Sequence, residues 1–202
     1  MARKKQFLGR HLMLKGQYAD LLLEGRKKTT IRAGVVVPRY EEIIIHGHGR
    51  PLAKARITRV ERKLVSELTD EDARRDGFPD RRSLLRALER VYGRLGPDDT
   101  VTILHLEVTQ RLDQLDPGDP YMGLEPADIA RLALRYLRDR LDDEETRILE
   151  DLTRTNSIRE TAQRLYGSWE RRKRVRRALR RALDMLVGEG LVRPRRRGRR
   201  AV

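Results

Sequence analysis

The chain has 202 residues, of which 38% are hydrophobic and 38% are charged, and its net charge is +15; it can form one large domain or two small ones with a heavily solvated surface. No apolar run approaches the roughly 20 residues of a membrane span, the chain has no Cys for disulfides or thiolate zinc sites, and its basic N-terminus lacks the apolar segment of a secretory signal. These exclusions predict a soluble, cytoplasmic protein with no membrane partner.

Strand patterns dominate the first 115 residues, which we expect to form one domain. Runs of aliphatic and β-branched residues predict strands at 6–14, 41–49, 51–65 and 99–112. Two helices are predicted between them, at 16–25 and 79–93, and each ends at a Gly as a helix meeting its C-cap should. Several short strands with inserted helices indicate the α+β class and a small β-barrel with helical decoration.

The segment LLLEGRKKTTIR, residues 21–32, passes abruptly from apolar to basic. A helix that ends at Gly25 and feeds a polar strand accounts for this change. In a strand, Lys27 and Thr30 would face opposite ways, so they converge only if Lys27 lies in the turn before the strand. Because Gly permits close backbone approach and the bases suit phosphate, the candidate nucleic-acid contacts are Gly25, Lys27, Lys28 and Arg32.

This segment resembles the hallmark of the ASCH domain family, relatives of the PUA RNA-binding fold. The family pattern is Gly-x-Lys-x-x-Thr-x-Arg, and Gly25, Lys27, Thr30 and Arg32 match it in register. A second matching element, LTDEDARRDGF at 68–78, leads into a helix as in the family. The resemblance covers roughly residues 5–112. It implies a PUA-like barrel whose cleft takes a base or nucleoside, and RNA rather than DNA as the partner.

Some small bacterial members of the family resemble amidohydrolases that deacetylate acetylcytidine with a Lys, a Thr and a later Glu. The resemblance implies these roles for Lys27, Thr30 and, one methylene shorter than the Glu, Asp76. A Lys buried in a cleft has a lowered pKa and can activate a Thr toward an amide carbonyl. The similar enzymes are single-domain proteins, however. We therefore favour binding without turnover; the alternatives are hydrolysis of an acetylated nucleoside and a purely structural loop.

The chain changes character at residues 116–123, which are rich in Pro, Gly and Asp and are interpreted as a linker. Helical patterns follow at 125–141, 142–156, 156–167 and 168–190. A Gly-flanked segment with Leu191 and Val192 is expected to dock back as a short strand. This order resembles a winged helix-turn-helix domain over 124–194, in which the last, strongly basic helix would enter a groove.

The basic excess lies at the C-terminal end. Residues 170–202 carry 14 Lys and Arg against 3 acidic residues, whereas the first 169 residues hold 32 against 28. This concentration of basic residues indicates a polyanionic partner. A membrane surface is disfavoured as that partner, because few apolar residues that could insert into it lie beside the Arg residues. The candidate contacts are Arg171, Arg172, Lys173, Arg174, Arg177 and Arg181 on the helix and Arg195, Arg196 and Arg197 in a basic disordered tail, 195–202. A merely solvated Arg-rich face and a place within a ribosome or ribonucleoprotein are the alternatives.

Two smaller features complete the pattern. His46 and His48 share a strand face at a spacing that can bind metal, but no third ligand is evident. We therefore predict a hairpin turn with exposed imidazoles, no metal and no cofactor. The only Trp, Trp169, is interpreted as a core anchor near the start of the basic helix, with base stacking as the alternative.

Overall fold

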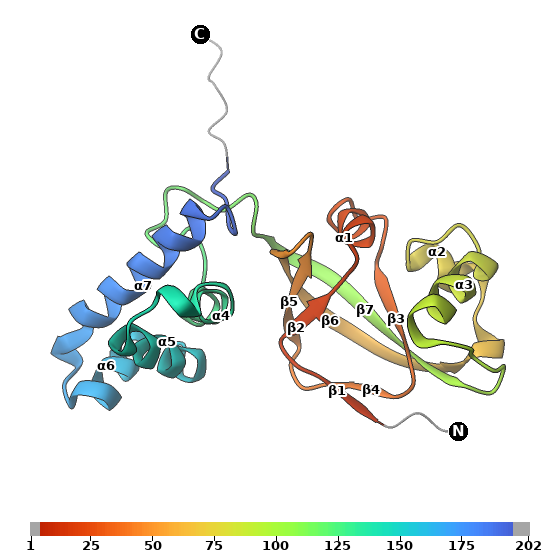
Figure 1. The fold of residues 1–202 in the computed structure, drawn as a ribbon, viewed down its shortest axis with the longest axis horizontal. Coiled ribbons are helices and arrows are strands. Elements are labelled where there is room, and N and C mark those ends of the chain that lie inside the picture. Colours follow the sequence, from red (N-terminus) through yellow and green to blue (C-terminus); the bar gives the residue numbers. More distant parts are fainter. Residues whose placement is uncertain (1–4, 196–202) are drawn as a thin grey trace, which may run out of the picture. The chain divides into compact units, whose positions relative to one another are not determined.

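The structure, a computed structural model, describes residues 5–195; residues 1–4 and 196–202, which include the predicted contacts Arg196 and Arg197, lie outside the described part. The chain divides into two units, residues 1–111 and 112–202, and the predicted linker segment lies within the range of the second. Figure 1 shows a curled sheet with helices in the first unit and a group of helices in the second. The predicted α+β class is confirmed. Within residues 5–195, no helix combines the length and apolar character needed to cross a membrane.

Five strands form the main sheet of the first unit, in the order β2-β5-β6-β7-β3. They are β2 (His11–Met13), β3 (Thr29–Ala33), β5 (Glu42–Gly47), β6 (Arg50–Leu64) and β7 (Thr100–Arg111). β2 pairs in parallel with β5, and the other neighbours are antiparallel. The β6–β7 ladder shifts register at two places, and because such bulges bend a strand and increase its twist, the sheet curls into a half-barrel (Figure 1).

The first predicted strand, residues 6–14, is two strands in the structure. β1 (Gln6–Leu8) pairs in parallel with β4 (Val36–Pro38), whereas β2 joins the main sheet. The interruption at Gly9 and Arg10 lets the chain change partners. Sequence patterning shows a strand's faces but not its partner, so this split was not predicted.

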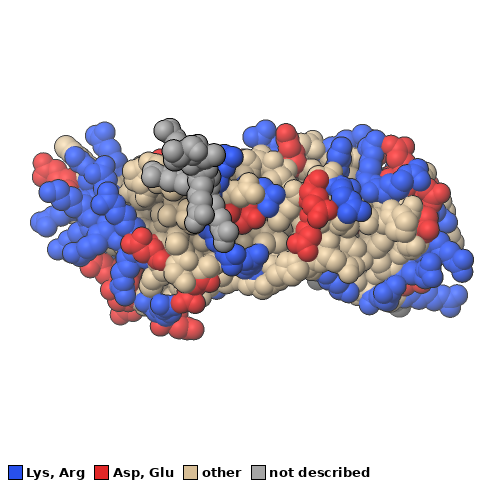
Figure 2. Space-filling model, turned by 90° about the horizontal axis from the view of Figure 1, so that it is seen from above, with Lys and Arg blue, Asp and Glu red and all other residues tan. Residues whose placement is uncertain are grey.

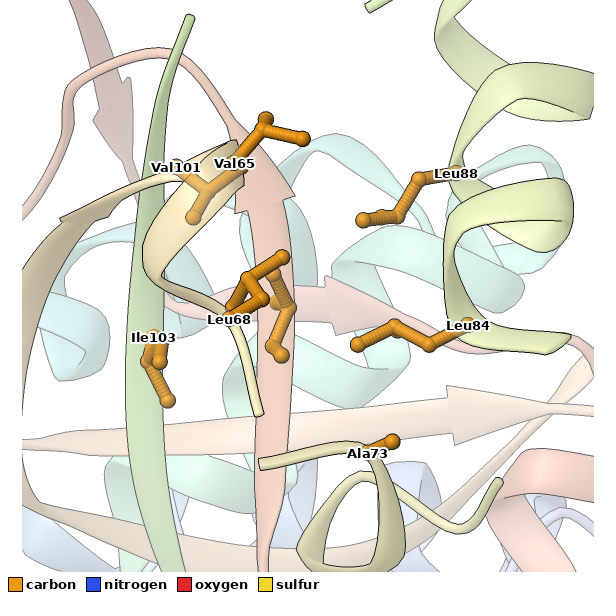
Figure 3. Close-up of a cluster of buried hydrophobic side chains, with 8 residues drawn as sticks. Val65, Leu68, Ala73, Leu84, Leu88, Val101 and Ile103 are labelled. Atoms are coloured by element: carbon orange, nitrogen blue, oxygen red, sulfur yellow. The ribbon is translucent and has the colours of Figure 1, made fainter. Parts of the chain in front are cut away.

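Helices pack against the sheet through two buried clusters. α3 (Arg81–Tyr92) turns Leu84 and Leu88 toward Val101 and Ile103 of β7, as Figure 3 shows. α1 (Gly16–Leu23) buries Leu22 in a second cluster with strand residues. Full burial of one such side chain stabilises the fold by roughly 1.5–3 kcal/mol. Both predicted helices are confirmed, and α3 is also the helix into which the second motif leads. The short α2 (Asp70–Arg75) lies within that motif and was not predicted.

The second unit is helical within its described residues. Its main helices are α4 (Pro126–Tyr136), α5 (Asp143–Thr155), α6 (Ile158–Tyr166) and α7 (Arg172–Gly188). α6 begins after Ser157, whose side chain accepts a hydrogen bond from the Glu160 N–H as predicted. α7 buries one apolar stripe, at Val175, Ala178, Leu179, Ala182, Leu183 and Leu186. Its basic residues therefore lie on the remaining faces.

The segment after α7 differs from the predicted wing. Val192 is buried as expected, but no hairpin forms there among the described residues. The chain instead runs parallel to residues 112–115, with one bridge between Leu115 and Pro194 and a hydrogen bond from the Arg195 N–H to the Leu115 carbonyl. Arg195, expected at the start of a disordered tail, is thus held by its backbone. Residues 112–115 are distant in sequence from this segment, which is why local patterning missed the pairing.

Candidate functional site

The end of α1 sets the position of Lys27. Gly25 has φ +74°, the Gly25 N–H donates to the Leu22 carbonyl, and the Arg26 N–H donates to the Leu21 carbonyl. These two bonds form a Schellman motif, as the sequence predicted for a Gly cap. The Lys27 N–H also donates to Leu21, and β3 starts only at Thr29. Lys27 therefore lies in the turn before the strand, which is the condition under which it can share a site with Thr30.

A buried ion pair joins this turn to α2. Lys27 is 3% exposed, and its Nζ lies 2.9 Å from Asp76 Oδ1 and donates to the Asp76 carbonyl at 2.7 Å. Asp76 Oδ1 also accepts the Ile31 N–H at 3.0 Å. The chain leaves α2 through Gly77, which has φ +90° and where a Cβ would lie 3.0 Å from Leu21 Cδ1. Asp76 thus reaches Lys27 despite its short side chain and connects α2 to β3.

Burial controls the titration of both partners. Desolvation lowers the pKa of Lys27, although the Asp76 carboxylate opposes the shift. Desolvation likewise raises the pKa of Asp76 to about 6, and the ammonium of Lys27 opposes it. A desolvated group prefers its neutral form unless an opposite charge lies within a few ångströms. At pH 7 the carboxyl, with its pKa of about 6, is mostly ionised, and its negative charge favours the protonated form of Lys27.

A cavity of about 170 Å³ adjoins this pair. It is lined by all three candidates for catalysis, Lys27, Thr30 and Asp76. Arg32, a further residue of the family hallmark, lines it as well. Gly25 and Lys28 are not among the lining residues. Lys28 is exposed, and its backbone N–H donates to the Arg75 carbonyl.

Aromatic rings and cations complete the cavity, and the sequence did not predict them. Tyr18, Phe78 and Tyr92 contribute rings, and Lys15 and Arg90 contribute cations. The Tyr18 and Phe78 ring centroids are 5.1 Å apart. Within residues 5–195, neither Lys15 nor Arg90 forms an ion pair, and Asp76 is the only acidic lining residue. The position of Tyr18 in the helical pattern of α1, and of Tyr92 in that of α3, could have suggested that each ring points inward. Neither pattern shows that both rings line the same cavity.

Arg32 is fixed at this cavity by two hydrogen bonds. Its guanidinium donates to the Met13 carbonyl at 2.9 Å and to the Tyr92 hydroxyl at 3.4 Å. A held guanidinium presents its remaining N–H groups in a defined direction, which suits a carboxylate or a phosphate. The cavity therefore combines positive charge at fixed positions with aromatic walls, and this combination can accept a planar, anionic ligand.

The ASCH domain model matches residues 5–110. The chain belongs to the ASCH domain family. No curated protein matches the sequence. One similar solved structure is the ASCH domain from Lactobacillus crispatus JV V101, at 16% identity and TM-score 0.40, covering 52% of this chain and 80% of that chain. Another is a protein from Enterococcus faecalis V583, at 19% identity and TM-score 0.39, covering 48% of this chain and 69% of that chain.

Outside the ASCH domain, basic side chains gather on α7. Figure 2 shows a concentration of Lys and Arg side chains at the left of the view. A hollow on this helix is lined by Lys173, Arg176, Arg177, Arg180, Arg181 and Asp184. Among the described residues, Lys173, Arg176 and Arg180 form no ion pair and are exposed. Arg176 and Arg180 were not among the predicted contacts, because sequence alone does not show which cations are already paired.

Two of the predicted contacts on α7 are held by the acidic start of α5. Arg174 donates to Glu144 at 3.3 Å, and Arg181 donates to Glu145. These bonds reduce the positive charge that both Arg offer to an external anion. Arg171 and Arg172 lie at the N-terminal end of α7, beside Trp169 in the preceding turn.

One minor prediction, for Trp169, was wrong, and another, a hairpin turn with exposed His46 and His48, was right for the turn and for His48 but wrong for His46. Trp169 is 43% exposed, so it is not a core anchor. His46 is fully buried in the ASCH domain and its Nε2 lies 2.8 Å from His11 Nδ1, whereas only His48 occupies an exposed turn, beside Asp20. Across residues 5–195, no group of three or more His, Cys, Asp or Glu is arranged to hold a metal ion.

Proposed function

We propose that this protein binds nucleic acid, with RNA preferred over DNA. The cavity of the ASCH domain would take a base or nucleoside, and α7 would contact the phosphate backbone. The observation that carries this proposal is the cavity itself, where three aromatic rings and the held Arg32 accompany two unpaired cations. The ASCH domain family is generally linked to RNA binding, which supports RNA as the nucleic acid.

The size of the cavity supports a small planar group. Sites that enclose a drug-sized ligand measure roughly 300–1,000 Å³, and this cavity measures about 170 Å³. A single base or nucleoside inserted into the space, with its phosphate outside, agrees with that volume. Lys15 and Arg90 would then be the phosphate partners, because they line the cavity and have no ion-pair partner among the described residues.

The free cations of α7 support a second contact with the backbone. Lys and Arg that neutralise phosphates supply affinity without reading sequence. The order of α6 and α7 agrees with the predicted helix-turn-helix core, and entry of α7 into a groove stays a prediction. The bound RNA could also be part of a ribosome or ribonucleoprotein. Co-purification from lysate with and without nuclease distinguishes binding to such an assembly from binding to RNA alone.

Titration calorimetry with the common ribonucleoside 5′-monophosphates tests the cavity. We expect Arg32→Gln to weaken binding by about 10- to 100-fold, because hydrogen bonds to charged groups contribute roughly 1.5–3 kcal/mol. Arg26→Gln is the matched control, since Arg26 lies in the turn before β3, its side chain is 71% exposed, and among the described residues it pairs only with Glu24. Equal affinities for the two variants would contradict a nucleotide site in the cavity.

Hydrolysis of an acetylated nucleoside is the second candidate, because Lys27, Thr30 and Asp76 line one cavity. Against it, the Lys27 ammonium is bonded twice to Asp76, and no hydrogen bond joins Lys27 to Thr30 among the described residues. A nucleophile normally lies within hydrogen-bond reach of its base. Incubation with acetylcytidine decides the question: no cytidine above the level of a Lys27→Ala control removes this candidate.

A further inference from the structure

The exposed ring of Trp169 is the feature from which the inference starts. Trp169 belongs to a single 3-10 turn, Trp169–Arg171, between α6 and α7, and is 43% exposed. The guanidinium of Arg172 lies 4.8 Å from the ring centroid, and that of Arg159 lies 5.4 Å from it. Trp169 therefore packs partly in the fold, but enough of its side chain remains exposed, beside two cations, for a ligand to reach the ring.

The turn that bears this ring is fixed on its N-terminal side. α6 ends at Gly167, which has φ +69° and whose carbonyl accepts a hydrogen bond from the Gln163 side chain at 3.0 Å. Ser168 then caps the turn by accepting the Glu170 N–H at 3.2 Å. Since the backbone around the ring is held by these bonds, little order has to be gained when a ligand binds.

A row of cations continues from the ring along α7. Arg172, Arg176 and Arg180 are spaced by four residues and therefore share one face of the helix. They extend over about 12 Å at a rise of 1.5 Å per residue. Among the described residues, Arg176 and Arg180 form no ion pair. The surface thus presents an aromatic platform at one end of a positively charged row.

The relative energies favour exchange of a guanidinium for a base. A cation–π contact at an exposed site contributes roughly 0.5–1 kcal/mol, whereas stacking of a base on an aromatic side chain contributes roughly 1–3 kcal/mol. A base that stacks on Trp169 releases Arg172 or Arg159, and the released guanidinium is then free to bind a phosphate. A paired base inside a duplex cannot offer its face in this way.

We propose that Trp169 is a stacking platform for an unpaired base of single-stranded nucleic acid, and that Arg172, Arg176 and Arg180 hold the adjoining phosphates. This inference rests on the proposed nucleic-acid binding and adds to it a selection for single strands by the second unit. An acidic peptide would meet the same charge but has no base to stack, so the two ligands are distinguishable.

Trp169 is the only Trp of the chain, so the fluorescence of the unmodified protein, excited at wavelengths that Tyr does not absorb, reports on this ring directly. We expect a short oligoadenylate RNA to quench that fluorescence in parallel with the anisotropy of a dye on the RNA. Duplex RNA of the same length and oligoglutamate of matched charge should leave it nearly unchanged. Trp169→Leu should weaken binding of the labelled RNA by about 5- to 100-fold, the range that corresponds to the stacking energy, and Trp169→Phe should restore most of it.

Each outcome decides one proposal. If the anisotropy shows binding while the fluorescence stays constant, the stacking inference is overturned and the proposed function stands. Equal quenching by oligoglutamate or by duplex RNA also overturns it, because charge alone then moves the ring's surroundings. If no RNA changes the anisotropy, the proposed function itself fails. Circular dichroism of the Leu variant separates loss of the platform from loss of the fold, and a folded Leu variant that binds normally overturns the inference.

Discussion

The Lys27–Asp76 pair links the chemistry of the cavity to the stability of the first unit. Lys27 donates both to the carboxylate and to the backbone carbonyl of Asp76, and the same carboxylate accepts the Ile31 N–H. One side chain from the turn after α1 therefore holds the end of α2 against β3. Such a pair is a weak source of net stability compared with apolar residues of the same volume, but removing one partner leaves an uncompensated buried charge.

Lys27→Met tests the cost of leaving the Asp76 carboxylate buried without its partner. At pH 8 we expect a loss of about 3–5 kcal/mol in the free energy of unfolding, because the Asp76 carboxylate is left without its partner. The loss should be smaller at pH 5, where the carboxyl protonates. Lys28→Met is the matched control, since Lys28 is exposed, and surface changes of this kind stay within about 0.5 kcal/mol. Chemical denaturation of both variants measures the difference, and similar losses for the two would contradict a buried charge pair.

The raised pKa of Asp76 predicts a pH dependence of stability. Burial holds that pKa at about 6 in the folded protein, above the ordinary value of about 3.9. Between these values the folded state binds more protons than the unfolded state. The contribution of Asp76 to the free energy of unfolding therefore falls as the pH rises from about 4 to about 6, and is constant above that. The difference in unfolding free energy between wild type and Asp76→Asn should fall over the same window; a rise would show that the carboxyl is instead held ionised.

At the scale of the elements, two left-handed glycines shape the site. Gly25 ends α1 in open space, whereas a Cβ at Gly77 would lie 3.0 Å from Leu21 Cδ1. A left-handed conformation costs an L-residue roughly 1–2 kcal/mol. We expect Gly25→Ala to cost about that much, and Gly77→Ala to cost more because Leu21 must shift as well. Thermal and chemical denaturation compare the two variants; an equal cost would mean that close packing at Gly77 is unimportant.

Regular, local features of these elements were predictable from the sequence. The apolar spacing of α3, its end at Gly93 and the Gly cap of α1 are encoded within a few residues, and each was confirmed. The division of the first strand into β1 and β2 was not predictable, because β4 and β5 are distant in the chain. The same reason applies to the segment at Val192, which was expected to be buried but pairs with residues 112–115 rather than with a neighbouring strand.

The candidate site was predictable only in part. The hallmark places Lys27, Thr30 and Arg32 together because it is a short, local pattern, and the resemblance adds Asp76. The aromatic residues Tyr18 and Tyr92 reach the cavity through the packing of two helices, which spacing along one helix does not specify. Trp169 lies near the start of an apolar stripe, yet its ring is exposed, because the turn before α7 rather than the helix period sets its direction.

For the whole molecule, much of the excess positive charge lies on α7, and this helix also contributes to the hydrophobic core. α7 buries Leu179, Leu183 and Leu186, so deletion of residues 170–202 would remove part of the core together with the cations. Loss of nucleic-acid binding after such a deletion would therefore not separate charge from folding. Substitutions on the exposed face avoid that problem, because α7 offers both paired and unpaired Arg residues for comparison.

Two double variants with the same net charge compare the unpaired and the paired Arg residues of α7. Arg176→Gln with Arg180→Gln removes two cations that have no ion-pair partner among the described residues, whereas Arg174→Gln with Arg181→Gln removes two that bind Glu144 and Glu145. Both variants lower the net charge equally. For single-stranded RNA, each lost phosphate contact reduces the slope of log affinity against log salt by about 0.7, so the first variant should lose about 1.4.

The second variant is expected to behave differently. Glu145 is 8% exposed, so loss of Arg181 leaves a buried carboxylate unpaired and should lower the stability of the second unit more than the first variant does. Its salt slope should change less, because the two Arg are already bound within the chain. Anisotropy titrations of labelled RNA over a range of salt concentrations measure both slopes. Identical slopes for the two variants would show that only net charge matters, and that α7 does not bind phosphates through its unpaired face.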